Sequence, residues 1–583
     1  MAKKEVILGI GGFTAHASAF VVVDGEILGA MEEERLSRKK HEGGWAKESI
    51  QWVLKEYGIR ETDITHISFS YDPWLRITKR IPYRLRFLFE KPLLTPYILF
   101  YELRSISEFL IRLKRLREKS GAELHYVRHH LAHAASAFFT SPYSESAFYT
   151  ADQRGEWDTT LLGKGEHTKL RILGNTTYPH SLGIFYAGIT QHLGFDRNDD
   201  YKVMGLAAYG NPQYADKMRK VIFPIEGCKF KIDTSYLSYH KTRGFLGGTY
   251  FTEKFLKEFG PERREDEPIT QQHMDIAASA QQVFEEIVFH QLNWLHEKTK
   301  SENLSIAGGC GLNGAMNGKI YEKTPFKHVF LSSVSGDNGL SMGGALYVRH
   351  HLLGQKRTAP LLRSDLGSEY SNEEIRECLE LYKLPYDECD DVVPAAVELL
   401  TKGSIVGWFQ GRMEYGARAL GHRTILANPT LSDMKDKINK YVKFREEFRP
   451  FAPSVLEEAA DKYFEIHDPI PFMTVVCPVK AEGIRKLPAT THVDNTARVQ
   501  TVNRKEQLLY WRLIDEFGKR SGVPVLLNTS FNVMGEPIVE HPRQAISCLF
   551  STGMDALVIG NFILKKESLR TTERERSEAG LAV

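Results

Sequence analysis

Two histidines that lie four residues apart, His129 and His133, are the residues in this sequence best placed to bind a metal ion. On a helix this spacing puts both imidazoles on one face, within reach of a single cation. Asp152 follows a strand-like run soon after them, and Asp337 lies in a glycine-rich turn far downstream. Two imidazoles with carboxylates, and no cysteine nearby in the sequence, favour a catalytic iron, manganese or zinc ion over a closed structural zinc. The alternative is that the histidines only cap or pack a helix.

A group of cationic residues in the second half of the chain could bind phosphate. They lie in three loops rich in glycine, proline and phenylalanine, and they are Arg412, Arg418, Lys443 and Arg449. Arginine forks bind phosphate oxygens in pairs and lysine adds a point charge, so this set could neutralise a triphosphate together with a phosphorylated donor. A predicted strand at 523–527 ends on Asn528 and Ser530, polar groups at a strand end, where open α/β sheets bind ligands. The alternative is a solvated basic surface.

Four residues nearer the N-terminus complete the candidate set. His16 lies in a turn after the first strand, where a base could meet a substrate hydroxyl, or where it is only an exposed turn residue. Lys202, predicted in a loop, could contact a phosphate or acyl group, although a loop lysine is more often just solvated. Gly309 and Asn313 lie where a strand runs into a glycine turn and a helix, a backbone that a nucleotide can approach closely.

Periodicity predicts the elements that must position these residues. An apolar strand at 6–10 ends in a glycine turn, and a hairpin about Asp24–Gly25 follows it. Strand, glycine turn and hairpin in this order open actin-like and sugar-kinase-like ATPase domains. Further strands are expected at 146–151, 159–163, 170–175, 304–307 and 404–409, and helices at 271–298 and, after a capping box at 371–374, up to 382. The polar stretch between 350 and 371 is the best candidate for a domain boundary.

The composition describes an ordinary globular chain of 583 residues, 42% hydrophobic and 26% charged. A net charge of +2 argues neither for nor against nucleic acid. The six cysteines are scattered without a Cys-x-x-Cys pair, so we expect a reducing compartment. We find no signal peptide and no run of the ~20 apolar residues that a spanning helix needs, so we expect a cytoplasmic protein.

A segment at about 73–120 differs from the rest of the chain because it is strongly basic and aromatic. Between residues 73 and 119 it holds twelve lysines and arginines against four glutamates, an excess of eight positive charges, interleaved with eight aromatic residues. Such an insertion can be a helical lid or part of an acceptor site, or it can contact a membrane surface. Nucleic acid is a third and weaker alternative, since basic patches alone are weak signals.

In order along the chain, a set of motifs resembles the O-carbamoyltransferases of the nodulation-factor and antibiotic-tailoring family. The resemblance covers nearly the whole chain, and its motifs lie at 129–134, 201–207, 308–313, 411–421, 448–453 and 527–532. The sequence departs from the family in the first turn, which usually carries His-Asp. Here Ala17 follows His16, so no acid stands beside the candidate base.

The resemblance implies an α/β chain with a duplicated actin-like (ASKHA) domain over 1–355, a YrdC-like domain over 370–565 and a charged tail at 566–583. In the family reading, the second domain uses ATP, Mg²⁺ and carbamoyl phosphate to form carbamoyl-adenylate, with Arg449 and Ser530 as catalytic residues. The first domain then transfers the carbamoyl group to a hydroxyl of a small molecule or glycan. There the resemblance implies Fe(II) or another divalent transition metal, with His16 as the base.

Three other functions remain open at this point. A tRNA threonylcarbamoyl-type transferase uses the same two folds, but a dedicated tRNA partner would predict a basic face over the metal cleft. An actin-like sugar kinase would need a catalytic aspartate but not the histidine pair. A non-enzymatic scaffold would have no reason to keep two basic, glycine-lined sites. We expect no nucleic-acid partner, and neither the acceptor nor the oligomeric state can be read from the sequence.

Overall fold

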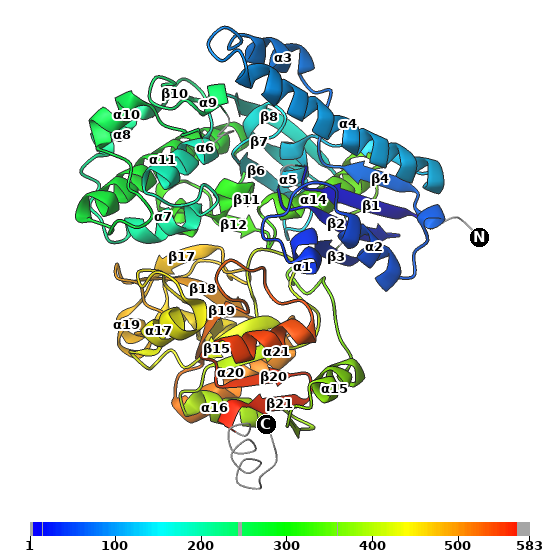
Figure 1. Ribbon diagram of the computed structural model, residues 1–583, viewed down its shortest axis with the longest axis vertical. Coiled ribbons are helices and arrows are strands. Elements are labelled where there is room, and N and C mark those ends of the chain that lie inside the picture. The colour runs from blue at the N-terminus through cyan, green and yellow to red at the C-terminus, as the bar shows by residue number, and fades with distance from the viewer. Residues whose placement is uncertain (1–3, 14, 243–247, 358, 568–583) are drawn as a thin grey trace. The chain divides into compact units, whose positions relative to one another are not determined.

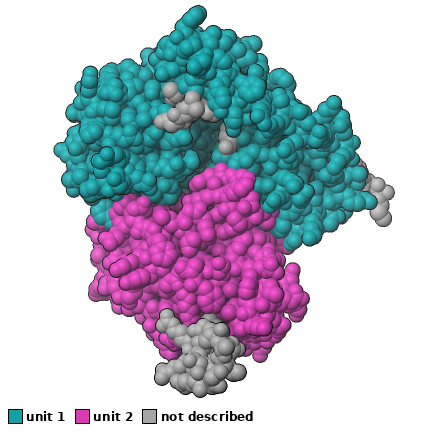
Figure 2. All heavy atoms as spheres, viewed as in Figure 1, with its two compact units in different colours: residues 1–33, 43–361 teal, residues 34–42, 362–583 magenta. Residues whose placement is uncertain are grey.

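The computed structural model describes residues 4–13, 15–242, 248–357 and 359–567. The chain divides into two compact units, which Figure 2 colours separately. Unit 1 comprises Met1–Glu33 and Gly43–Leu361, and unit 2 comprises Glu34–Glu42 and Leu362–Val583. Both units combine helices with β-sheets, so the mixed α/β fold predicted from the sequence is confirmed. Most of the expected charged tail, 568–583, lies outside the described residues.

One five-stranded sheet of unit 1 is built on the N-terminal hairpin. In spatial order its strands are β3 (Glu26–Glu32), β2 (Ser18–Val23), β1 (Val6–Gly11), β4 (His66–Phe69) and β5 (Glu123–Tyr126). β1 pairs antiparallel with β2 and parallel with β4, and β4 pairs parallel with β5. β1 is buried along its whole length, which explains its uninterrupted run of apolar residues and glycine.

The second five-stranded sheet repeats the order and the strand directions of the first. In spatial order its strands are β8 (Lys169–Thr177), β7 (Asp158–Glu166), β6 (Glu145–Ala151), β11 (Asn303–Ala307) and β12 (His328–Leu331). β6 takes the place of β1, since it pairs antiparallel with β7 and parallel with β11. The strands predicted in this half of the chain, and the hairpin about Asp24–Gly25, are confirmed.

Two helices, α5 (His129–Phe138) and α14 (Leu340–Leu346), pack against each other in unit 1. α14 contacts β1, β2 and β4 of the first sheet, and α5 contacts β6, β7 and β11 of the second. Glycine permits the close approach: a Cβ on Gly343 would lie 1.9 Å from the carbonyl oxygen of Ala132. The helix pair therefore brings residues from both halves of unit 1 to one place.

The remaining described helices of unit 1 lie mainly around the second sheet. They include α6 (Leu182–His192), α7 (Asp200–Ala207), α8 (Ala215–Val221), α10 (Glu253–Phe259) and α11 (Gln271–Thr299). The long helix predicted at 271–298 is α11. The sequence was wrong about Lys202, which lies in α7 rather than in a loop. Within 227–267, β10 (Phe230–Ile232), α9 (Tyr239–Thr242) and α10 form.

The basic insertion folds into two helices, α3 (Ile77–Leu85) and α4 (Leu94–Ser120). In Figure 1 they run along the outside of unit 1, with α3 standing away from both sheets. α4 ends at Gly121, whose left-handed backbone (φ 69°) closes the helix. Among the described residues, no helix combines the length and the apolar character needed to cross a bilayer.

Unit 2 is organised on a nine-stranded sheet. In spatial order its strands are β13 (Asp387–Glu388), β21 (Phe562–Lys565), β20 (Ala556–Ile559), β14 (Val406–Phe409), β15 (Arg423–Ala427), β19 (Val525–Ser530), β16 (Ala452–Leu456), β18 (Thr496–Val502) and β17 (Val475–Pro478). Its helices include α15 (Asn372–Leu381), α16 (Val393–Thr401), α20 (Leu508–Ser521) and α21 (Pro542–Ser551). The capping box of Ser371 and Glu374 is confirmed. Asn528 and Ser530 lie inside β19, whereas the sequence predicted them after its end.

A short N-terminal segment, residues 34–42, belongs to unit 2. Arg35 donates a hydrogen bond to the carbonyl oxygen of Gly416 over 2.8 Å. Arg38 donates to the carbonyl oxygens of Pro537 and Ile538, each over 2.7 Å. The Arg35 contact ties the segment to the glycine-rich loop that carries two of the predicted phosphate-binding arginines, and the Arg38 contacts tie it to the residues before α21.

Candidate metal centre and anion-binding cluster

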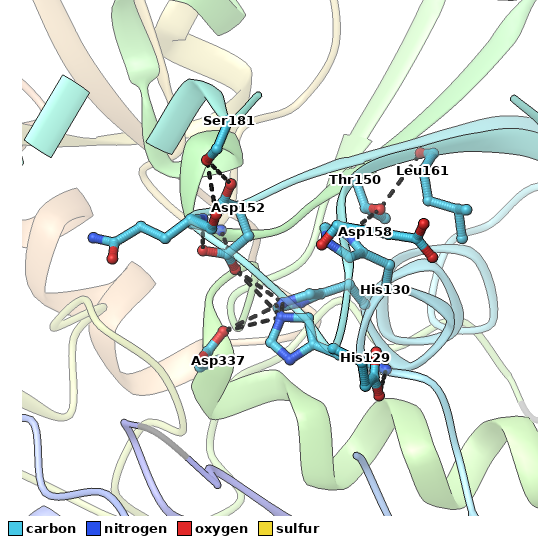
Figure 3. Close-up of polar contacts among 12 residues, drawn as sticks. His129, His130, Thr150, Asp152, Asp158, Leu161, Ser181 and Asp337 are labelled. Carbon is cyan, nitrogen blue, oxygen red and sulfur yellow. Dashed lines mark hydrogen bonds and ion pairs between the residues drawn. The ribbon is translucent and has the colours of Figure 1, made fainter. Parts of the chain in front are cut away.

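Four side chains of unit 1 converge, and they are the four that the sequence singled out as metal ligands. His133 Nε2 lies 3.1 Å from His129 Nε2, 3.1 Å from Asp152 Oδ2 and 3.3 Å from Asp337 Oδ1. One ligand atom from each residue lies within 4.8 Å of the others. Figure 3 shows Asp152 and Asp337 pointing towards the same place as His129.

Three separate elements bring these side chains together. The histidines stand one turn apart on α5, whose ten residues are all buried. Asp152 directly follows β6, and Asp337 begins η4 (Asp337–Gly339), the short 3₁₀ turn that leads into α14. Because α5 packs against both β6 and α14, the two carboxylates reach the same face of the helix.

The Asp152 carboxylate is held by backbone donors. Its Oδ1 accepts the N–H of Gln153 over 2.6 Å, and its Oδ2 accepts the N–H of Gly309 over 3.1 Å. The turn that carries Gly309 requires glycine at the preceding position, because a Cβ on Gly308 would lie 2.2 Å from the carbonyl oxygen of Ala151. The glycine turn predicted to receive a nucleotide therefore also orients a carboxylate of the cluster.

A second buried carboxylate, Glu156, fixes the start of α5. Its Oε1 accepts the backbone N–H of His129 over 3.0 Å and that of Asp72 over 2.8 Å. An acidic group is favourable at a helix N-terminus, where backbone donors have no partner within the helix. Glu156 was not predicted from the sequence, although an acid four residues after Asp152 was a signal for it.

The middle histidine of the motif, His130, has a different role from its neighbours. Its Nδ1 lies 2.9 Å from Thr150 Oγ1, and its Nε2 lies 3.0 Å from the carbonyl oxygen of Asp158. Burial lowers the pKa of His130 well below its ordinary value, so the ring is neutral. Both ring nitrogens are used inside the protein, so His130 packs the helix onto the second sheet, as Figure 3 shows.

The charges within the cluster favour a cation at its centre. Burial alone would lower the pKa of His133, but Asp152 and Asp337 raise it to about 9. Burial would likewise raise the pKa of Asp152, but the hydrogen bonds from His129 and His133 hold it well below its usual value. Without an ion, a proton on His133 offsets one of the two carboxylate charges, and the remaining negative charge favours a cation.

The donor set fits a divalent transition metal. Two imidazole nitrogens and two carboxylate oxygens suit iron, manganese or zinc. Asp337 Oδ1 is buried and faces His133 Nε2 at 3.3 Å and His129 Nε2 at 3.7 Å, as expected of an oxygen that is placed for an ion. His129, His133, Asp152 and Asp337 are therefore the residues that could hold one.

His16 lies in the turn between β1 and β2, in a left-handed backbone conformation with φ 51°. This turn borders the segment that carries Asp337. Ser18 Oγ donates a hydrogen bond to the carbonyl oxygen of Asn338 over 3.0 Å. A Cβ on Gly11 would lie 3.0 Å from the Cβ of Leu340. A base in this turn belongs to the same part of unit 1 as the metal cluster.

Lys202 and Asn313 are both engaged within the protein. Lys202 Nζ lies 2.9 Å from Asp199 Oδ2 and 5.2 Å from the ring centre of Phe195. The Asn313 amide exchanges hydrogen bonds with Gln281 over 2.9 and 3.0 Å, and it also accepts the N–H of Met316 at the start of a helix. A ligand at either residue would have to share or displace these contacts.

Asp200 follows Asp199, the ion-pair partner of Lys202, and it was not predicted from the sequence as a site residue. Burial raises its pKa to about 7, and Asp152 adds to the shift by its negative charge. Its Oδ1 accepts the Thr190 hydroxyl over 3.0 Å. A carboxyl group that titrates near neutrality beside the metal cluster is a candidate for proton transfer.

In unit 2, Lys443 and Ser530 come together at the end of β19. Lys443 Nζ donates to Ser530 Oγ over 3.2 Å and to Asn532 Oδ1 over 2.8 Å. Burial, with the repulsion of Arg445 and Arg449, lowers the pKa of Lys443 well below its ordinary value. A lysine in this setting gains from an anion that restores its charge.

Four arginines gather near this lysine. Arg498, in β18, has its pKa lowered well below the ordinary value by burial and then by the charges of Arg418, Arg445 and Arg449. Its Nε atom is buried without a hydrogen-bond partner among the described residues. A buried arginine with an unsatisfied donor, near enough to three other arginines for their charges to lower its pKa, fits a bound anion. Arg418 and Arg449 were predicted from the sequence, but Arg445 and Arg498 were not recognised as members of the site.

Arg412 and Asn528, which were predicted to belong to the same site, use their side chains for contacts elsewhere in unit 2. Arg412 donates to the carbonyl oxygen of Gly367 over 3.0 Å and lies 3.4 Å from Glu369. The Asn528 amide donates to Ala419, Ser454 and Gln500 and accepts from Thr424, so it cross-links the sheet. Asn528 was expected at a strand end, but it lies inside β19, where buried amides must be satisfied by neighbours.

Comparison with known proteins assigns the family. The model of the carbamoyltransferase N-terminus matches residues 6–346, and that of the carbamoyltransferase C-terminus matches residues 397–566. The chain belongs to the carbamoyltransferase family. Its resemblance to this family, inferred above from ordered motifs, is therefore confirmed, and the protein is a carbamoyltransferase enzyme.

Relatives match this carbamoyltransferase over most of its length. The nodulation protein NolNO of Sinorhizobium fredii is 36% identical over 95% of this chain and 80% of its own. NolO of Bradyrhizobium diazoefficiens is 38% identical over 76% of this chain and 79% of its own. An uncharacterized protein of Synechocystis is 37% identical over 98% of both chains. The solved structure of T. kodakarensis HypF covers 60% of this chain and 48% of its own at 14% identity, but the TM-score of 0.31 is too low to indicate a shared fold.

Proposed function

We propose that this carbamoyltransferase is an ATP-dependent O-carbamoyltransferase that uses carbamoyl phosphate. The product of the first step is carbamoyl-adenylate, and the acceptor is a hydroxyl of a small molecule or glycan. The observation that carries the proposal is the convergence of His129, His133, Asp152 and Asp337 in an enzyme of this family. The separate cluster of cations in unit 2 supports a second site for phosphorylated substrates.

The first half-reaction is assigned to unit 2. Water hydrolyses carbamoyl phosphate to carbamate and inorganic phosphate, a carbamate oxygen attacks the α-phosphorus of ATP, and pyrophosphate leaves. Arg418, Arg449 and Arg498 would neutralise the phosphate groups, because arginine forks bind phosphate oxygens in pairs. Lys443 and Ser530 lie 3.2 Å apart and would contact the donor or the leaving group. Mg²⁺ would accompany ATP.

The second half-reaction is assigned to unit 1. An iron(II) or other divalent transition ion held by the four ligands would supply a Lewis acid for the carbamoyl group. His16 would take the proton of the acceptor hydroxyl, a role that typically contributes 10²–10⁴-fold to a rate. The hydroxyl oxygen then attacks the carbamoyl carbon, and AMP departs. Asp200 is an additional group that could carry the proton away.

We also propose the finer fold assignments. Two sheets with the same strand order and directions support an actin-like duplication in unit 1. For unit 2 we propose a YrdC-like domain, on the basis of the ordered motifs in its sequence. Mixed sheets alone do not define such a domain, so this assignment depends on the sequence resemblance.

The insertion is proposed as a surface that docks on an anionic membrane. Its exposed apolar side chains gather on α3, on the link between the helices and on the first half of α4; they are Ile81, Leu85, Phe89, Leu93, Tyr97, Phe100, Tyr101 and Leu103. Phe89 is 95% exposed and Leu93 is 88% exposed, values that are unusual for large apolar residues. Lys79, Arg86 and Lys91 are exposed beside them. Apolar residues flanked by lysine and arginine fit the interface of an anionic bilayer better than an acidic protein surface.

The products of ATP distinguish the proposed reaction from its alternatives. With carbamoyl phosphate and a hydroxyl acceptor, we expect AMP and pyrophosphate in equal amounts, without ADP and without any need for tRNA. A sugar kinase would form ADP and a phosphorylated acceptor. A tRNA-modifying enzyme would form AMP only when tRNA is present. Formation of ADP, or dependence on tRNA, would therefore overturn the proposal.

A further inference from the structure

A second cluster of possible metal ligands lies in the first sheet of unit 1. His66 begins β4 and stands opposite Glu123, the first residue of the edge strand β5, in parallel register. His125 is two residues further along β5. Residues two apart on a strand, and residues paired across neighbouring parallel strands, share one face of a sheet. The three side chains therefore stand on the same face.

The distances among these groups match those around a single ion. His66 Nδ1 lies 3.1 Å from His125 Nε2. Two nitrogens each about 2.0–2.1 Å from one metal lie roughly 2.9 Å apart at a right angle and roughly 3.3 Å apart in a tetrahedron. The Glu123 oxygens lie 3.8 Å from His66 Nδ1 and 3.9 Å from His125 Nε2. A small rotation of this carboxylate would bring one oxygen into the same shell.

The site is also reachable and not fully enclosed. The side chains of His66 and His125 are 17% and 12% exposed, whereas that of Glu123 is 67% exposed. The largely enclosed imidazoles have restricted orientations, and the exposed carboxylate leaves a path for an ion and its water. The site offers two imidazoles, one carboxylate and a position open to water. This set suits Zn²⁺ or a similar divalent ion that is neither strongly hard nor strongly soft.

We propose that His66, Glu123 and His125 form a second metal site, which takes Zn²⁺ or a similar divalent transition ion. The ion would link the edge strand β5 to β4. β5 continues through Val127 and Arg128 directly into α5, so an ion here would stiffen the segment that presents His129. The site is independent of the proposed transfer chemistry and remains if that proposal fails.

Zinc binding by the full-length chain tests this site. In the background of His129→Ala, which removes a ligand of the first cluster, we expect the chain still to bind one Zn²⁺ in equilibrium dialysis. The double variants His129→Ala/His66→Ala and His129→Ala/His66→Gln should no longer bind this Zn²⁺ ion. The glutamine variant keeps a hydrogen-bonding group beside His125, which guards against simple unfolding. Zn²⁺ should also raise the melting temperature of His129→Ala but not of either double variant.

A matched control is available in the second sheet. His328 begins β12 as His66 begins β4, and it lies outside every cluster of possible metal ligands among the described residues. His129→Ala/His328→Ala should therefore bind zinc as His129→Ala does. Equal zinc binding by His129→Ala and both His66 double variants would overturn the proposal. If His129→Ala binds as much metal as the wild type, and metal is lost only when His66 is changed, the first cluster is contradicted and the second is supported.

Discussion

At the scale of single residues, His133 links protonation to metal binding. Without an ion its pKa is about 9, so the ring carries a proton at pH 7. A metal binds the neutral imidazole, and the proton must leave when the ion enters. We predict that an ion entering the first cluster releases about one proton at pH 7, and that the metal affinity of this cluster rises with pH until the ring is neutral above about pH 9.

Calorimetric titration in two buffers of different ionisation enthalpy measures this release. The number of protons should fall towards zero as the pH passes through about 9, because His133 is then already neutral. Measured in a His66→Gln background, which removes the second proposed site, metal binding at pH 7 without proton release would contradict the protonation assigned to His133.

The arginines of unit 2 yield a second prediction at this scale. Arg449→Ala should slow pyrophosphate release that depends on carbamoyl phosphate by roughly 10- to 100-fold, since a hydrogen bond to a charged group contributes about 1.5–3 kcal/mol. Arg485→Ala, on an exposed side chain of α19 (Ala481–Lys486), is the matched control and should be neutral. Equal rates in both variants would show that the arginine cluster is only a solvated surface.

Single residues also show how much of the site could be predicted from the sequence. His129, His133, Asp152 and Asp337 could be selected because helix spacing and carboxylates after strands or in turns have recognisable patterns. Arg498 could not, because it lies in a strand far along the chain from the basic loops, and only the sheet brings it to them. Asn528 was placed at a strand end because the sequence cannot show that its amide is satisfied by three neighbouring segments.

At the scale of elements, the contact of α5 with α14 decides whether the ligands meet. A Cβ on Gly343 would lie 1.9 Å from a backbone oxygen, so Gly343→Ala should force the helices apart and destabilise the protein by about 1–3 kcal/mol. Gly188, in α6, is the control, because a Cβ there would only make contacts of 3.5 and 3.6 Å. Gly188→Ala should be neutral or stabilising by about 0.5–1 kcal/mol.

Urea denaturation of both alanine variants measures the difference, with metal content as a second readout. Gly343→Ala should also bind metal less tightly, since α14 follows Asp337 directly. Equal stability of the two variants would contradict the close packing inferred for this helix pair.

The insertion permits another prediction about elements. The wild-type chain should sediment with vesicles that contain an anionic lipid, and much less with vesicles of zwitterionic lipid alone or at high salt. Phe89→Ser/Leu93→Ser should lose most of this binding. The control is Leu508→Ser/Phe550→Ser, which removes exposed apolar side chains from unit 2. Equal sedimentation of both double variants would leave the lid or acceptor-site role as the better account of the insertion.

Most elements could be predicted from periodicity, because apolar runs, glycine turns and a capping box are local signals. The strands of both sheets in unit 1 and the long helix α11 are examples. The error at Lys202 arises because α7 is a short helix that is stabilised by packing against α11 and α6. Such tertiary contacts leave little trace in the local sequence.

At the scale of the whole molecule, the sequence predicted the family but not the arrangement of strands. The repeated order of the two sheets in unit 1 depends on pairings between distant segments, such as β6 with β11. The assignment of residues 34–42 to unit 2 likewise depends on the contacts of Arg35 and Arg38. Nothing in the local sequence of this segment indicates those contacts.

The most direct test of the central claim separates the two half-reactions in one variant. His133→Ala should lose the metal ion of the first cluster and should fail to transfer the carbamoyl group to an acceptor. It should still release pyrophosphate from ATP when carbamoyl phosphate is present, because that step is assigned to unit 2. His328→Ala should behave as the wild type in all three measurements. Full metal content or normal transfer in His133→Ala would contradict the account.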